Sequence, residues 1–215
     1  MSMIDTPLLD NLNIFHSKSP VFDTPQLAQF VDRTPKLRAL HEASFFFDGS
    51  DISVSLPRTD RRGLRFRITR LQSDLSVMVR LCTSSFLRTL IPMMKQLYIL
   101  DNGNPRLYWL NNVESSQWLD LLRLFTTVED LYLSRGFSQH IVATLHRIIE
   151  EGPEEMTEVL PSLQNLFLEG PLASSPGPAE EAVEQFVAAL HLSSCLIKVS
   201  QWETAGHQWW PQEYQ

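Results

Sequence analysis

A short motif recurs along the chain in a constant register. It consists of a proline, any residue, an apolar residue, two more residues, a leucine, any residue and an apolar residue. Copies begin at Pro7, Pro35, Pro92 and Pro161, and a copy from Thr126 keeps the apolar register without the proline. Their central leucines, separated by 28, 57, 34 and 35 residues, are Leu12, Leu40, Leu97, Leu131 and Leu166. Self-similarity at this spacing predicts stacked supersecondary units.

Each copy predicts a short strand. Proline cannot continue a helix, so we expect it to end the preceding helix and to begin an extended segment. Successive side chains of a strand point to opposite faces, so Leu166 and Leu168 would face the core and Phe167 would face outward. Residues 63–69 supply a candidate strand within the long interval, and residues 195–200 supply a last one.

Segments with helical spacing of apolar residues separate these strands, at residues 24–33, 71–90, 115–125, 138–149 and 178–192. Alternation of strands and helices implies right-handed crossovers and a parallel sheet. We therefore predict an α/β fold over residues 1–202: a leucine-rich-repeat-like solenoid with irregular repeats and a curved, mostly parallel sheet. Residues 51–56 and 63–69 would equally form a hairpin that interrupts the solenoid.

Composition and charge narrow the class of protein. Hydrophobic residues make up 43% of the 215 residues and charged residues 20%, which is typical of a globular protein. The two cysteines, Cys82 and Cys195, are widely spaced, which favours the cytoplasm or nucleus. No apolar run approaches the ~20 residues of a membrane helix, so we expect no membrane partner. Residues 111–215 carry 4 Lys and Arg against 15 Asp and Glu, which disfavours nucleic acid as a partner.

Several long runs carry a family resemblance. The strand motif resembles a degenerate leucine-rich repeat, and four runs, at residues 22–43, 115–134, 158–170 and 186–202, resemble the C-terminal repeat region of fungal F-box-like proteins. The resemblance implies the target-binding arm of a ubiquitin-ligase substrate receptor, in which an N-terminal F-box docks on a cullin-type ligase and the repeats hold the protein target. The sequence leaves no room for an F-box before Pro7, so a ligase partner is expected only if an F-box lies upstream.

The outward positions of the five motif copies would form a column across the sheet, because neighbouring strands lie about 4.8 Å apart. These positions are Asn13, His41, Tyr98, Tyr132 and Phe167. Adjacent aromatic side chains on an open face are typical of interface hot spots. Equally, the rings would stack on one another or under a loop and only stabilise the sheet. The flanking residues expected to supply polar specificity include Asp130, Asn165 and Glu169.

A basic segment precedes the third clear copy of the motif. It holds six arginines between Arg58 and Arg70, and Arg65 and Arg67 alternate with apolar residues. Guanidinium groups in this pattern bind an acidic peptide or a phosphate bidentately, or else form a solvated strand face. We list Arg65 and Arg67 among the candidate partner-binding residues.

Motifs of catalysis, cofactor binding and metal binding are missing from the sequence. It contains no nucleophile elbow, phosphate-binding loop, dinucleotide fingerprint or zinc-protease motif, and its six histidines lack metal-ligand spacing. We therefore expect a protein-recognition module rather than an enzyme, with no cofactor. Two alternatives remain: an F-box-less orphan or structural fragment without a specific ligand, and an enzyme with an unrecognised site.

The last 13 residues form a separate, Trp-rich tail, residues 203–215. Because the adjacent Trp209 and Trp210 would be costly to expose to water, we expect the tail to fold back as an end cap. Alternatively, the tail forms a second contact site.

Overall fold

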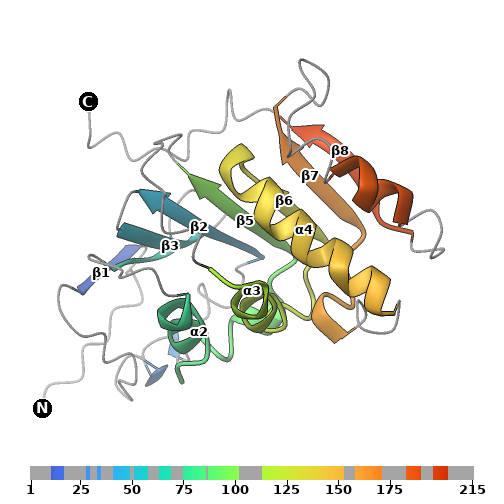
Figure 1. Ribbon diagram of the computed structural model, residues 1–215. Helices are drawn as coiled ribbons and strands as arrows, with labels where there is room; N and C mark the ends of the chain where they lie inside the picture. Colours follow the sequence, from blue (N-terminus) through green and yellow to red (C-terminus); the bar gives the residue numbers. More distant parts are fainter. Residues whose placement is uncertain are drawn as a thin grey trace, which may run out of the picture.

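The computed structural model describes residues 11–16, 28–29, 33–34, 41–48, 51–57, 63–68, 75–85, 87–101, 113–152, 158–170, 183–189 and 196–202. The Trp-rich tail and the predicted helix starts at residues 24–27 and 178–182 lie outside these residues. Among the described residues, strands form one sheet and helices cover one of its faces (Figure 1).

The described strands are β1 (Asn11–His16), β2 (Glu42–Asp48), β3 (Asp51–Pro57), β4 (Gly63–Ile68), β5 (Gln96–Asp101), β6 (Asp130–Leu133), β7 (Asn165–Glu169) and β8 (Lys198–Trp202). They form an open sheet in the order β1-β4-β3-β2-β5-β6-β7-β8. β3 is antiparallel to both of its neighbours, β2 and β4, and every other neighbouring pair is parallel. The α/β class and the mostly parallel sheet are therefore confirmed.

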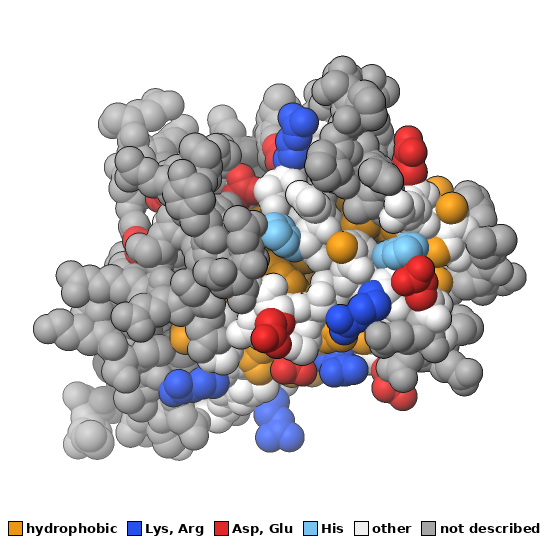
Figure 2. All heavy atoms as spheres, in the orientation of Figure 1, with side chains coloured by type: hydrophobic (Ala, Val, Ile, Leu, Met, Phe, Trp, Pro, Cys, Tyr) orange, Lys and Arg blue, Asp and Glu red, His pale blue; other side chains and the backbone are white. Residues whose placement is uncertain are grey.

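The described helical elements are α2 (Ser76–Cys82), the 3-10 turn η2 (Ile91–Met93), α3 (Ser115–Leu122), α4 (Arg135–Glu151) and the helical residues 183–189. The longer helices lie against the same face of the sheet (Figure 1). Seen from that side, acidic and basic side chains are intermixed over the helices (Figure 2). The spacing predicted for 115–125 and 138–149 is confirmed, because the apolar stripes of both helices are buried, namely Trp118, Leu121, Leu122, Phe125, Ile141, Leu145, Ile148 and Ile149.

The main core lies between the helices and the inward side chains of the sheet. In the parallel half of the sheet, strands β5–β8, the inward side chains include the leucines and isoleucine of the motif: Leu97, Ile99, Leu131, Leu133, Leu166 and Leu168. Trp118 and Phe125 of the α3 region pack with them, and Trp118 meets Phe137 of α4 edge-on at 5.7 Å between ring centroids. Burial of these side chains is the main favourable term in folding.

A repeated hydrogen-bond pattern joins the starts of the parallel strands. The carbonyl of Lys95 accepts the backbone N–H groups of Glu129 and Asp130, and the carbonyl of Glu129 accepts those of Gln164 and Asn165. Two hydroxyl groups make equivalent hydrogen bonds three residues before β6 and β7. Thr127 Oγ1 donates to the carbonyl of Pro92 at 2.8 Å, and Ser162 Oγ donates to the carbonyl of Thr126 at 2.9 Å. The copies from Pro92, Thr126 and Pro161 are thus structurally equivalent.

The register predicted for the Pro35 copy is wrong. The sheet pairs Ala43, not Leu40, with Leu97, so the strand lies three residues later than predicted. In the predicted register Glu42 would take an inward position, whereas the observed register turns Glu42 to the other face and buries Ala43, Phe45 and Phe47. Burying an unpaired carboxylate costs far more than burying phenylalanine gains, so the hydrophobic alternation of residues 43–47 sets the register.

Two further expectations are corrected. Pro92 lies within η2 and Pro161 within a turn, so each proline precedes the strand by several residues rather than beginning it. The candidate strand at 63–69 is β4, but it pairs with β1 and β3 and does not lie between β2 and β5. The alternative hairpin of residues 51–56 with 63–69 is confirmed as the antiparallel β3–β4 pair.

Candidate functional site

The strand register places one residue of every described strand in a single row across the sheet, and where the side chains are described they lie on the outward face. From the β1 edge to the β8 edge this row is Asn13, Arg65, Ser55, Ser44, Tyr98, Tyr132, Phe167 and Ser200. The predicted adjacency of Tyr98, Tyr132 and Phe167 is confirmed. His41 is not in the row, because Ser44 occupies the position next to Tyr98 and His41 lies just before β2.

The three aromatic residues, which we call the aromatic column, are stacked face to face. The ring centroids of Tyr98 and Tyr132 are 4.2 Å apart with an interplanar angle of 11°. Those of Tyr132 and Phe167 are 4.4 Å apart at 7°. Both faces of the Tyr132 ring are therefore occupied, and the spacing follows the separation of the parallel strands.

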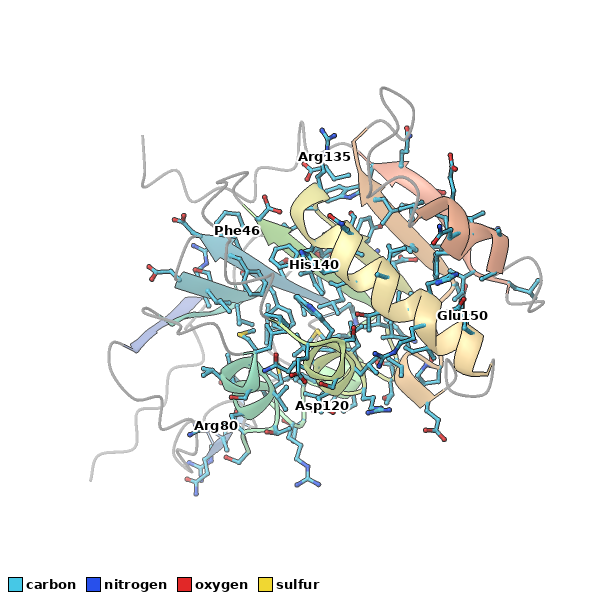
Figure 3. All side chains as sticks on the ribbon, viewed as in Figure 1. Phe46, Arg80, Asp120, Arg135, His140 and Glu150 are labelled. Carbon is cyan, nitrogen blue, oxygen red and sulfur yellow. The ribbon has the colours of Figure 1, made fainter. Side chains whose placement is uncertain are left out.

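Trp202 borders the aromatic column at the carboxyl ends of the strands. Its indole meets the ring of Tyr132 edge-on, with centroids 5.5 Å apart at 78°, and its Nε1–H donates to the carbonyl of Leu133 at 3.2 Å. Phe46 of β2 (Figure 3) packs against the same cluster. Sequence reasoning missed Trp202, although its place four residues after Lys198 in one strand would have put it on the outward face.

A polar row borders the column at the amino ends of the strands. Gln96 Nε2 donates to Asp130 Oδ2 at 3.0 Å, and Asn165 Nδ2 donates to Asp130 Oδ1 at 2.7 Å. The register continues this row to Lys198, which is exposed. Asp130 and Asn165 thus lie where the sequence predicted them, with their side chains already bonded to each other.

Exposure rises along the column toward the β8 edge. Tyr98 is only 5% exposed and Ser44 beside it 4%, whereas Tyr132 and Phe167 are half-buried and Ser200 is exposed. Burial raises the pKa of Tyr98, and the neighbouring Tyr132 adds to that rise. Burial, followed by the charge of Asp130, also raises the pKa of Tyr132. The surface available to a partner is therefore the β6–β8 end, and both tyrosines are neutral at physiological pH.

Glu169 lies two residues after Phe167 in β7, opposite Trp202, and its carboxylate is engaged by the start of α4. Its Oε2 accepts the backbone N–H of Arg135 at 3.1 Å, and Asp101 of β5 accepts the backbone N–H of Gly136 and the hydroxyl of Ser134. These groups lie at the first turn of α4, whose start is marked by Arg135 in Figure 3. The two carboxylates satisfy donors that a helix N-terminus leaves unpaired, so Glu169 is engaged in holding α4 on the sheet.

The candidate arginines lie away from the column. Arg65 belongs to the same outward row, but the strands β3 and β2 separate it from Tyr98, a distance of about 14 Å for three strand spacings. Arg67 lies two residues further along β4, opposite Ser53, and its side chain is outside the described residues. The strand order therefore places β4, which carries both arginines, three strands from β5, where the aromatic column begins.

Other chemistries find little support among the described side chains. They contain no group of His, Cys, Asp or Glu that could hold a metal ion. Cys82 is buried in α2, and burial raises the pKa of its thiol, which keeps the thiolate rare. In the described part of the chain no helix has the length and apolar character to cross a membrane.

Comparison with known proteins adds no family. No protein-family model, curated protein or solved structure matches this chain.

Proposed function

We propose that this chain is a protein-recognition module that binds its target on the outward face of β6–β8. The observation that supports this most is the exposed end of the aromatic column, where the half-buried rings of Tyr132 and Phe167 lie between a polar row and Trp202. Aromatic side chains held rigidly in place supply contact area without much loss of conformational entropy on binding, which is why they dominate interface hot spots.

The borders of the column give a partner orientation as well as contact area. Asp130 accepts a hydrogen bond from an amide donor at each carboxylate oxygen, so its charge is held in a defined position. Lys198 adds a positive charge at the β8 end of the same row. Charged groups at the rim of an interface favour one register over others and contribute more to specificity than to affinity.

We further propose that β5–β8 form a leucine-rich-repeat-like solenoid belonging to an F-box-type substrate receptor, working in the cytoplasm or nucleus. The equivalent hydrogen bonds made by Thr127 and Ser162 support a repeated unit. The resemblance of residues 22–43, 115–134, 158–170 and 186–202 to F-box-like proteins supports the choice of family. Docking on a cullin-type ligase would require an F-box upstream of this sequence.

Affinity capture with surface variants tests the recognition proposal. A Tyr132→Ser/Phe167→Ser double variant is compared with a matched control, Asp120→Ser/Arg123→Ser, whose side chains lie exposed on the helix face. We expect the column variant to lose a reproducible partner that wild type and control both retain, with thermal unfolding confirming that all three are folded. Retention of that partner by the folded column variant contradicts the proposal, and unfolding of the variant assigns the rings a structural role instead.

A further inference from the structure

The aromatic column ends one strand before the sheet does. β5, β6 and β7 each carry an aromatic residue at the same register position, and β8 carries Ser200 there. The rings of the column are nearly parallel and 4.2–4.4 Å apart, close to the ~4.8 Å separation of strands. A fourth ring would therefore lie directly above Ser200, whose short side chain is exposed.

The described surroundings leave this position open. Among the described residues no ring lies on the β8-facing side of Phe167, and the indole of Trp202 is directed away, toward Tyr132 and Leu133. We call the space above Ser200, between Phe167 and the β8 edge, the column gap. A planar ring in the gap would stack on Phe167 in the offset geometry that aromatic pairs favour.

The rim of the column gap carries a positive charge and an apolar side chain. Lys198, two residues before Ser200 and on the same face, is exposed and makes no ion pair with any described residue. Leu196, at the amino end of β8, is 93% exposed, the largest exposure of any large hydrophobic side chain described. A cationic partner side chain would be repelled by Lys198, whereas a carboxylate beside the entering group would be attracted.

Pairing of a partner strand with the edge of β8 fits this surface less well. Lys198 and Gln201 are both exposed on β8, and polar side chains of this kind, lysine above all, protect an edge strand from pairing. A side chain that enters from the face of the sheet avoids this difficulty.

We propose that the column gap binds one aromatic side chain of a protein partner, presented by an acidic segment whose carboxylate reaches Lys198. The ring stacks on Phe167 above Ser200 and completes the column. This inference rests on the proposed recognition function and names the chemistry of the partner.

Capped amino acids serve as the probes. N-acetyl-tyrosinamide, N-acetyl-leucinamide and N-acetyl-argininamide are titrated separately into the full chain, and the Trp202 indole N–H resonance, assigned with Trp202→Phe, reports on the site. We expect tyrosinamide to shift this resonance and to bind about threefold to tenfold more tightly than leucinamide, the factor that one aromatic pair supplies. Argininamide should bind more weakly than tyrosinamide.

Three variants distinguish binding in the column gap from nonspecific binding. Ser200→Tyr fills the gap with the chain's own ring and should abolish tyrosinamide binding, whereas Ser200→Ala leaves the gap open and should bind like wild type. Phe167→Leu keeps an apolar side chain but removes the face of the ring, so it should also abolish tyrosinamide binding. This variant tests the inference even if Ser200→Tyr does not fold.

Equal binding of leucinamide and tyrosinamide, tighter binding of argininamide, or unchanged binding to both Ser200→Tyr and Phe167→Leu would overturn the inference. Its failure is distinct from failure of the recognition function. If the Tyr132→Ser/Phe167→Ser variant still loses its captured partner, the β6–β8 face binds a protein by another contact.

Discussion

The two halves of the sheet differ in strand direction and in how their strands are connected. From β5 to β8 each strand is parallel to the last, and a crossover that contains helix or turn separates one from the next. From β2 to β4 the chain instead turns back twice, and only Gly49 and Ser50 separate β2 from β3. Antiparallel strands can be joined by two residues, whereas parallel strands require a crossover connection.

The outward faces of the halves differ accordingly. In the parallel half the outward row is Tyr98, Tyr132 and Phe167, and in the antiparallel strands β2 and β3 it is Ser44 and Ser55. Both halves bury regular apolar side chains on the inward face, such as Leu131 in β6 and Leu56 in β3. Both halves therefore share an apolar inward face, whereas the stacked aromatic residues of the outward row occur in the parallel half.

Truncation of the outward rows should give the largest contrast. We expect Tyr98→Ala to lower the free energy of unfolding by about 3–5 kcal/mol, since Tyr98 is 5% exposed and a buried aromatic ring is lost. Ser55→Ala, in the same row of the antiparallel half, should change it by less than about 0.5 kcal/mol. Denaturant titration measures both, and similar losses at the two positions would remove the contrast between the outward faces.

Truncation of the inward rows should show no such contrast. Leu131→Ala and Leu56→Ala each remove a fully buried side chain of the main core, so each should cost about 2–5 kcal/mol. Because both residues belong to one core, circular dichroism and fluorescence should report one coincident unfolding transition for each variant. Two separated transitions would mean that the halves fold as independent units.

The anchoring of α4 belongs to the parallel half alone and should have a moderate effect. Asp101→Ala removes the acceptor of the Gly136 N–H and of the Ser134 hydroxyl, so we expect a loss of about 1–2 kcal/mol, typical of a lost helix cap. The control is Asp120→Ala, which lacks such contacts and has only a 3.7 Å ion pair with Arg123 on the surface. A loss at Asp101 no greater than at Asp120 would show that α4 is held by its apolar face alone.

The sequence predicted the parallel half well for a physical reason. Leu97, Leu131 and Leu166 repeat at 34 and 35 residues and lie in direct register, because each unit is one strand with one crossover and the core requires leucine at the same place. The register of the Pro35 copy was predicted wrongly because a pattern of three apolar positions matches by chance in a leucine-rich sequence. The competing alternation of Ala43, Phe45 and Phe47 made the stronger strand.

The site was predictable only in part. Alternation within strands was enough to bring Tyr98, Tyr132 and Phe167 together, since strand neighbours share a face. Nothing in the motif indicates that burial rises toward Tyr98, because exposure depends on what lies over the sheet. Likewise, the hydrogen bond from the start of α4 to the carboxylate of Glu169 depends on where that helix begins in space, which the motif does not indicate.

Alkaline pH should give the smallest effect, again confined to the parallel half. Burial raises the folded-state pKa of Tyr98 above the unfolded value of about 10, so its contribution to stability is present below pH about 10 and is lost as pH rises through the folded pKa. The free energy of unfolding should therefore fall above pH about 10, and less steeply in Tyr98→Phe. An identical slope in wild type and variant would show that Tyr98 ionises as freely as in the unfolded chain.

Site-specific photo-crosslinking tests the central claim, that the outward face of the parallel half binds a protein. A photoreactive phenylalanine is placed at position 196, at the amino end of β8, where the leucine is 93% exposed, or at position 55, in the outward row of the other half. The account predicts a reproducible protein crosslink in cell extract from position 196 and not from position 55. Equal crosslinking from both positions, or crosslinking from position 55 alone, would contradict it.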